Sequence, residues 1–213
     1  MEKNLEIILV HGFGKNETDM NFLKKKFINS EYSVQVINLP LTFHKIEKAF
    51  NIFNSFMLNE IKKYPSRKFV LIGHSTGSII IQNFTKNFSN LNIHCNILIC
   101  PPNKGSYLAD IASKIPPISF ILKTLSDITT TKINALNLKS QTIPQGIIMG
   151  VSNKLLFSKL TSSLNDGRVS ISSALKGTYR DFIILKYHHK KIHFTDECFN
   201  QIIFFIKNFY FKK

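Results

Sequence analysis

One serine in this sequence stands between two glycines, in a setting that suits a nucleophile. Residues 73–77 read Gly-His-Ser-Thr-Gly, with Ser75 at the centre, after an apolar run at 68–72 and before a helix-like run at 78–84. Glycines are needed there because a sharp turn brings strand and helix too close for Cβ atoms, and its apical residue adopts strained backbone geometry. Five-residue patterns of this kind also arise by chance, but the strand before and the helix after favour an exposed serine nucleophile.

The same serine needs a base, because a serine hydroxyl is a weak nucleophile at neutral pH. Three histidines follow the last predicted strand: His188, His189 and His193. Adjacent residues in an extended segment point in opposite directions, so at most one of His188 and His189 can face Ser75. We predict His189 as the base, because it lies just past the strand end, and His188 and His193 stay open as alternatives.

An acid must orient that base, and position favours Asp166. It lies in the run Asn-Asp-Gly-Arg-Val at 165–169, which follows the predicted strand at 145–151. A tight turn there would put its carboxylate at the carboxyl side of the sheet, although Asp-Gly is also a common turn signal without any catalytic role. The rivals are placed less well, since Asp181 begins a strand and Asp196 opens a helix. The other two, Asp110 and Asp127, lie in the long segment between the fourth and fifth strands.

A third requirement is a site for the oxygen that becomes negative when a carbonyl turns tetrahedral, usually supplied by backbone N–H groups. The sequence His-Gly-Phe-Gly at 11–14 directly follows the first predicted strand. Its glycines allow close backbone approach to a ligand, so we predict that the amide of Phe13 converges with that of Thr76. Alone, this sequence would equally fit a plain glycine turn.

Strands and helices alternate along the chain, which predicts a mostly parallel sheet covered on both faces. Most predicted strands are continuous runs rich in Ile and Val, as in strands buried on both sides. The predicted strands are 5–10, 33–37, 68–72, 95–100, 145–151 and 182–187. The predicted helices are 20–29 with Asp19 as its cap, 45–64, 76–88, and 196–209 capped by Thr195.

One long segment, 101–142, separates the fourth and fifth strands. It contains two proline pairs and is longer than a crossover needs, which suggests one or two extra helices over the carboxyl ends of the strands, where such sheets bind ligands. We therefore predict a single domain over 1–213 with a small cap at 101–142. Apolar residues of the cap, among them Ile118, Ile121 and Leu122, would line an acyl pocket; packing of the helix on the sheet is the alternative for each of them.

The net charge of +15 at pH 7 raises the question of anionic partners. Nearly all of the charge is lysine, spread along the chain, and only three residues are arginine. Nucleic-acid sites favour arginine and interleaved aromatic residues, so we expect no specific nucleic-acid role. Attraction to an anionic lipid surface or to anionic substrates stays open.

The remaining composition favours a cytoplasmic protein. The three cysteines are odd in number and lie in apolar surroundings, which suits reduced, buried thiols. No apolar run is long enough to span a bilayer, and the first strand is too short and too soon interrupted for a secretory signal. The oligomeric state does not follow from the sequence.

Together these marks resemble the α/β-hydrolase superfamily, in its lipase and esterase-like branch. The resemblance rests on 11–14, on 73–77, on Gly-Ser-Tyr-Leu-Ala-Asp at 105–110, on 165–169 and on the histidine cluster, in the order Ser, Asp, His typical of the superfamily. It implies Ser75 as nucleophile, Asp166 as acid, His189 as base, and Phe13 with Thr76 as oxyanion hole. The sheet would be a minimal one of about six strands, because larger members have additional strands before the one that leads into the His-Gly loop.

The resemblance implies hydrolysis of a carboxylic ester, with an apolar acyl or alkyl group, through an acyl-enzyme. No metal or organic cofactor is expected, since the histidines lack zinc-ligand spacing. A thioesterase or an acyltransferase with the same triad, and a non-catalytic binding protein on the same fold, remain alternatives.

Overall fold

The computed structural model describes residues 4–138, 142–152 and 164–213, apart from the side chains of 108, 118 and 119. Its strands form one six-stranded sheet in the order β2-β1-β3-β4-β5-β6, and every neighbouring pair is parallel. The strands are β1 (Leu5–Val10), β2 (Ser33–Ile37), β3 (Lys68–His74), β4 (Ile93–Ile99), β5 (Gln145–Gly150) and β6 (Asp181–Leu185). The predicted α/β architecture with six strands is confirmed.

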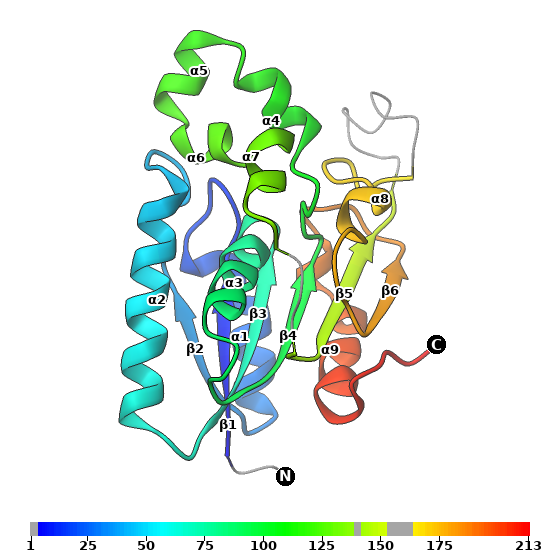
Figure 1. Ribbon diagram of the computed structural model, residues 1–213. Coiled ribbons are helices and arrows are strands. Elements are labelled where there is room, and N and C mark those ends of the chain that lie inside the picture. The colour runs from blue at the N-terminus through cyan, green and yellow to red at the C-terminus, as the bar shows by residue number, and fades with distance from the viewer. Residues whose placement is uncertain (1–3, 139–141, 153–163) are drawn as a thin grey trace.

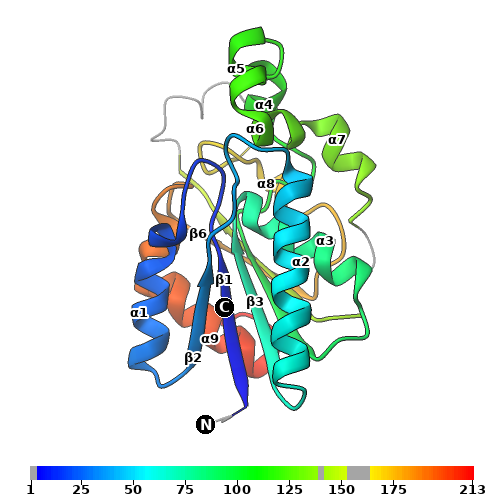
Figure 2. The same cartoon turned by 90° about the vertical axis from the view of Figure 1, so that its left-hand side faces the viewer.

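Helices cover both faces of the sheet, as Figures 1 and 2 show. Helices α2 (Ile46–Lys63) and α3 (Thr76–Asn87) lie on one face, and α1 (Asn21–Asn29) and α9 (Asp196–Asn208) lie on the other. Every residue of β1 is buried, and so is every residue of β3 after Lys68, because both strands are central and covered on both sides. Phe27 of α1 packs edge-on against Phe199 of α9, with ring centroids 5.1 Å apart.

Of the two helix caps predicted from the sequence, one is present and the other is not. Thr195 caps α9 as predicted, because its Oγ1 accepts a hydrogen bond from the backbone N–H of Cys198. The prediction that Asp19 caps a helix is wrong. A short 3₁₀ helix, η1 (Glu17–Met20), precedes α1, and Asn16 caps it, whereas Asp19 lies inside η1 with its side chain buried.

The segment at 101–142 contains more helices than predicted. In its described part four short helices replace the expected one or two: α4 (Tyr107–Ala112), α5 (Pro116–Ile121), α6 (Lys123–Asp127) and α7 (Thr130–Ala135). They lie beyond the carboxyl ends of the strands (Figure 1). The Pro116-Pro117 pair opens α5, where a missing N–H costs nothing, and so divides the segment.

Side-chain hydrogen bonds tie this helical segment to the rest of the fold. Asp127 of α6 accepts from the backbone N–H of Ile46 at the start of α2, and Thr124 donates to the carbonyl of His44. Whether the segment acts as a cap over a binding site, within a single domain, stays a prediction.

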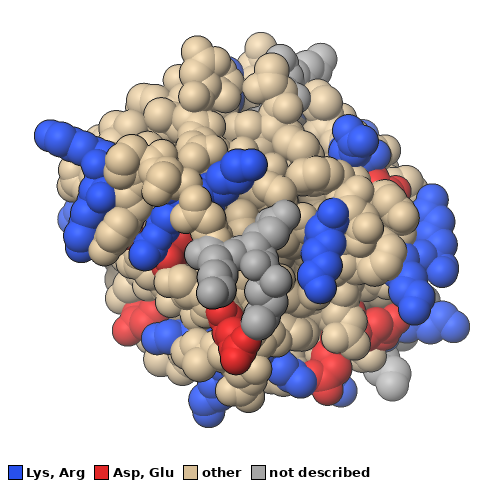
Figure 3. All heavy atoms as spheres, turned by 90° about the horizontal axis from the view of Figure 1, so that it is seen from below, with Lys and Arg blue, Asp and Glu red and all other residues tan. Residues whose placement is uncertain are grey.

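The positively charged side chains are dispersed on the face that Figure 3 shows, with acidic side chains among them, and do not form one stripe. All three cysteines are free and buried, as predicted. Across the ranges described above, no helix is long and apolar enough to cross a membrane.

Candidate active site

Ser75 occupies the sharp turn between β3 and α3. Its backbone has φ 54° and ψ −121°. Such a positive φ is energetically unfavourable for any residue that carries a Cβ atom. The two glycines are needed for contact reasons: a Cβ on Gly73 would lie 2.7 Å from the carbonyl carbon of Gly77, and a Cβ on Gly77 would lie 2.5 Å from the carbonyl oxygen of Val10. The turn expected from 73–77 is therefore present.

The structure brings Ser75, His189 and Asp166 together from three separate loops. Nε2 of His189 lies 3.0 Å from Oγ of Ser75, and Nδ1 of His189 lies 2.7 Å from Oδ2 of Asp166. Asp166 is fully buried and His189 is 1% exposed. The loops follow β3, β5 and β6, so parallel strands deliver all three side chains to one edge of the sheet.

The hydrogen bonds define the tautomer of His189. A carboxylate can only accept, so Nδ1 of His189 carries the proton and donates it to Asp166, which leaves Nε2 to accept from the Ser75 hydroxyl. Burial by itself would raise the pKa of Asp166, but the charge and hydrogen bond of His189 outweigh it and hold that pKa below its ordinary value. Asp166 is thus an anion at neutral pH.

Backbone contacts hold the acid in place. Oδ1 of Asp166 accepts from the backbone N–H groups of Arg168 and Val169, at 2.9 and 2.8 Å. Close approach of its loop to the loop after β6 depends on Gly150, because a Cβ there would lie 2.4 Å from the carbonyl oxygen of Tyr187.

Residues 11–14 lie beside the serine as predicted. A Cβ on Gly12 would be 3.0 Å from Cβ of Ser75, so glycine lets this loop approach the nucleophile. His11 is buried and shapes the loop: its Nε2 accepts from the backbone N–H of Leu39, and its Nδ1–H donates to the carbonyl of Gly12. Within the described chain, the backbone amides of Phe13 and Thr76 have no hydrogen-bond acceptor.

The other two histidines of the cluster do not contact Ser75 through a hydrogen bond within the described residues. β6 ends at Leu185, so His189 lies beyond the extended strand, and its backbone N–H donates to the carbonyl of Asp166. His188 does not line the recess at Ser75. His193 is buried against Asp19 and His74, with its Nε2 3.2 Å from Oδ2 of Asp19.

The group formed by Asp19, His74 and His193 was not predicted. The rings of His74 and His193 stack with centroids 3.9 Å apart, and the ring of His74 lies 4.9 Å from that of His189. Burial alone would raise the pKa of Asp19, but His193 and His74 hold it below its ordinary value. No sequence pattern indicates this group, because its members come from η1, β3 and η3 (Ile192–Phe194), which meet only in the folded chain.

The recess next to Ser75 is small and bordered by cations. It has a free volume of about 10 Å³, which is about enough for one water molecule. Its walls are Gly12, Phe13, Lys15, Asp19, His74, Ser75, Arg168, His189, Lys190 and His193. The predicted acyl-pocket residues are not among them: Ile121 is 56% exposed, Leu122 is half-buried, and the side chain of Ile118 lies outside the described part.

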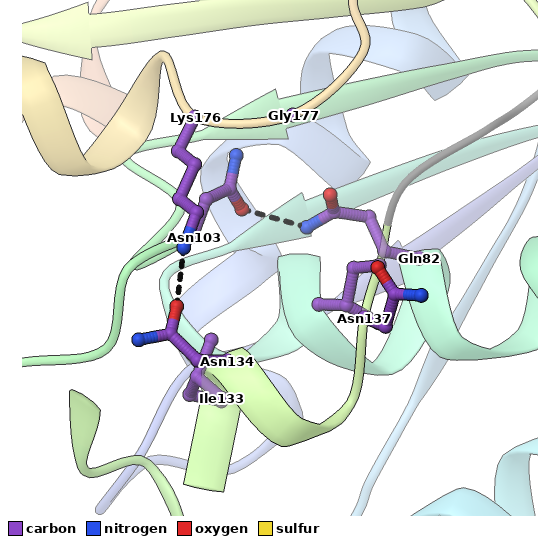
Figure 4. A pocket seen from close by; sticks show the side chains of 8 residues that line it. Gln82, Asn103, Ile133, Asn134, Asn137, Lys176 and Gly177 are labelled. Atoms are coloured by element: carbon purple, nitrogen blue, oxygen red, sulfur yellow. Dashed lines mark hydrogen bonds between the residues drawn. The ribbon is translucent and has the colours of Figure 1, made fainter. Parts of the chain in front are cut away.

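A second recess lies beside α3 and α7, and amide side chains line it (Figure 4). Asn103 accepts from Nε2 of Gln82 at 2.8 Å and donates to the carbonyl of Ala174 at 2.7 Å. Lys176 donates to the side-chain oxygen of Asn134. The bonds of Asn103 join the loop after β4 to α3 and to the short helix α8 (Ile171–Ala174), and the bond of Lys176 joins the segment after α8 to α7. The recess is therefore a structural junction.

The parallel sheet, the strained serine turn and the order of the three site residues define the α/β-hydrolase superfamily. Residues 2–121 match the model of the family described as "Putative serine esterase (DUF676)", and this chain belongs to that family. Membership places the protein broadly among serine ester hydrolases. No curated protein matches the chain.

Solved structures of similar fold include lipases and esterases. The mature form of Bacillus licheniformis lipase BlEst2 is 18% identical, with a TM-score of 0.77, over 98% of this chain and 93% of that chain. Its propeptide form is 17% identical, with a TM-score of 0.81, over 100% of this chain and 52% of that one. The metagenomic carboxyl esterase MGS0156 is 12% identical, with a TM-score of 0.68, over 90% of this chain and 66% of that one. At these identities the likeness concerns the fold.

Proposed function

We propose that the protein hydrolyses carboxylic esters with an apolar acyl or alkyl group, through an acyl-enzyme formed on Ser75. The observation that carries the proposal is the continuous contact from Ser75 to His189 to Asp166, at 3.0 and 2.7 Å. Hydrogen-bond contact between a serine, an imidazole and a buried carboxylate is what activates a hydroxyl at neutral pH.

In the first half of the reaction Ser75 Oγ attacks the ester carbonyl while Nε2 of His189 accepts its proton. Asp166 stabilises the resulting imidazolium through Nδ1–H. The tetrahedral intermediate collapses when the bond to the alkoxy oxygen breaks, and the imidazolium gives its proton to that oxygen. An alcohol leaves, and the acyl group stays on Ser75.

In the second half a water molecule attacks the acyl carbonyl and His189 accepts the proton of that water. The bond to Ser75 Oγ breaks, the proton returns to the serine, and the carboxylic acid leaves. Phe13 and Thr76 serve as the oxyanion hole in this proposal. Support comes from the absence of an acceptor for either amide within the described chain, together with the position of Gly12 against Ser75.

Turnover of short p-nitrophenyl esters tests the proposal. The Ser75→Ala variant is expected to lose at least about 10³-fold in kcat, because the nucleophile is removed. Ser89→Ala is the matched control, since Ser89 is exposed in the loop after α3 and should retain full activity. Equal turnover by the Ser75→Ala variant and the wild type would overturn the assignment, and much faster turnover of acyl thioesters would replace the ester by a thioester.

An anionic lipid surface is the partner that the exposed side chains favour. Tyr107, Ile111, Ile115, Phe120 and Ile121 are exposed on or beside α4 and α5, at 79% for Phe120. Exposed lysines lie nearby at Lys114 and Lys123, and the recess at Ser75 is bordered by Lys15, Arg168 and Lys190. Apolar side chains beside cations suit the interface of an anionic membrane.

Co-sedimentation with vesicles tests this surface. The wild type is expected to bind vesicles that contain about 30 mol % anionic lipid more tightly than neutral vesicles, and the Phe120→Ser variant is expected to lose most of that binding. Equal binding to both vesicle types would remove the lipid partner from the proposal. A cytoplasmic location also stays a proposal, and the three free, buried cysteines support it.

A further inference from the structure

We propose that His74, the residue before the nucleophile, is a positioning residue. Its ring donates a hydrogen bond to the backbone carbonyl of His189 and so holds the loop of His189 in place. This inference rests on the proposed function, because it concerns how the base is aligned on Ser75. It adds a role for a side chain that takes no part in the proton transfers described above.

The backbone of His189 is held from both sides. Its N–H donates to the carbonyl of Asp166 at 2.9 Å, and its carbonyl oxygen lies 3.1 Å from Nε2 of His74. One partner, Asp166, is itself a residue of the site, and the other, His74, is the neighbour of Ser75 in the sequence. The hydrogen bond from His74 links the loop after β6 directly to the turn that carries the nucleophile.

The chemistry of the carbonyl group defines the protonation of His74. A carbonyl oxygen can only accept, so Nε2 of His74 carries a proton. Nδ1 lies 3.7 Å from Oδ2 of Asp19, too far for a hydrogen bond, and it has no other partner within the described chain. Burial, followed by the charge of His193, lowers the pKa of His74 to about 3, in agreement with a neutral ring that donates through Nε2.

Packing keeps the His74 ring in the orientation that this bond needs. One face of the His74 ring stacks on the ring of His193. Nε2 of His193 in turn lies 3.2 Å from Oδ2 of Asp19. Lys15 lies 3.3 Å from the other oxygen of Asp19 and balances its charge. His74, His193 and Asp19 are all more than nine-tenths buried, so the ring has little freedom to turn away from His189.

A metal ion is the competing explanation for these three side chains, because their ligand atoms lie within 4.8 Å of one another. The ring arrangement favours the positioning role. Two imidazoles that share one ion splay apart around it, whereas the rings of His74 and His193 stack at 3.9 Å with an angle of 30° between their planes. The neighbouring ammonium group of Lys15 already supplies the positive charge that Asp19 needs.

Two substitutions at position 74 separate the role of the donor from that of the ring. A glutamine amide reaches as far as Nε2 of histidine, whereas an asparagine amide reaches only as far as Nδ1. His74→Gln can therefore still donate to the carbonyl of His189, and His74→Asn cannot. His94→Gln is the matched control, because Nε2 of His94 also contacts a backbone carbonyl, that of Ile206 at 2.8 Å, but far along β4 from the site.

The measurement is the steady-state hydrolysis of a p-nitrophenyl ester by the four proteins. His74→Asn is expected to lose about 10- to 100-fold in kcat with KM changed less than about threefold, because a displaced base impairs proton transfer more than substrate binding. His74→Gln is expected to stay within about threefold of the wild type in kcat, and His94→Gln to equal it.

Equal kcat values for the Asn and Gln variants, whether both low or both at the wild-type level, would overturn the positioning role, since the donor would then make no difference. So would an equal loss in the His94→Gln control. Activity of the Asn variant that is restored by added Zn²⁺ would assign the cluster to a metal instead. Failure of the wild type to turn over any ester would contradict the proposed function itself, so the two failures are distinguishable.

Discussion

At the scale of single residues, three contacts carry the account: Ser75 to His189, His189 to Asp166, and His74 to the backbone of His189. That the side chains of Ser75, His189 and Asp166 meet could be predicted from sequence, because each lies in a segment that follows a strand of a parallel sheet, and such strands end at one edge. The contacts of Asp19 could not. Its position before a helix indicated a cap, and only the fold reveals two histidines from distant segments around it.

The Asp166→Asn variant is the first prediction at this scale. An amide has the same shape as the carboxylate but can present an N–H to Nδ1 of His189, which would favour the wrong tautomer and leave the imidazolium without an anion. We expect kcat to fall by about 10³- to 10⁴-fold with little change in KM. An Asn variant with a kcat within about tenfold of the wild-type value would contradict the role of Asp166.

The second prediction concerns stability against pH. The pKa of His74 falls from 6.5 to about 3 on folding, so between these values the unfolded chain holds a proton that the folded chain lacks. The free energy of unfolding is therefore unaffected by this group above pH 6.5. It falls by about 1.4 kcal/mol per pH unit as the pH is lowered from 6.5 towards 3. His74→Gln lacks this group.

Urea unfolding between about pH 6 and pH 4.5 measures this effect. The free energy of unfolding of the wild type is expected to fall more steeply with acidification than that of His74→Gln, and His94→Gln should behave as the wild type does. Parallel slopes for the wild type and His74→Gln would mean that His74 is not buried in its neutral form.

At the scale of elements, the existence of the six strands followed from the apolar runs, while their ends did not. β3 continues through His74 and β4 begins at Ile93, because pairing with neighbouring strands extends both beyond their apolar cores. The division of 101–142 into α4, α5, α6 and α7 was also missed, since such short helices depend on side-chain ties such as that of Asp127 to Ile46. Propensity summed over so few residues is weak.

A glycine at the end of β5 supplies the prediction at this scale. In Gly150→Ala the new Cβ would lie 2.4 Å from the carbonyl oxygen of Tyr187 and 3.1 Å from Cβ of Asp166, so the loops that carry the acid and the base must separate. We expect kcat/KM to fall by at least about tenfold, together with a lower Tm.

Gly177→Ala is the contrasting variant. Its φ is 106°, so alanine is strained there, but its Cβ would meet nothing within 4 Å. We expect a stability loss of about 1 kcal/mol with activity retained. Equal activity in the two alanine variants would show that separation of the loops after β5 and β6 does not affect the site.

At the scale of the whole molecule, one sheet serves both stability and the site. Its central strands are buried between α2 and α3 on one face and α1 and α9 on the other (Figures 1 and 2). The residues that the proposed reaction uses all follow the carboxyl ends of its strands. The fold could be predicted because strand and helix periods alternate along the whole chain. The small volume of the recess at Ser75 could not, since it depends on how four separate segments of the chain pack together.

The most direct test of the central claim is covalent labelling with a fluorophosphonate, followed by mass spectrometry of the intact protein and its peptides. The account predicts one added phosphonyl group, carried by the peptide that contains Ser75. It predicts labelling at least about 10²-fold slower in a folded His189→Ala variant, because the hydroxyl then has no base. Labelling of His189→Ala at the wild-type rate, or a label on another residue, would contradict it.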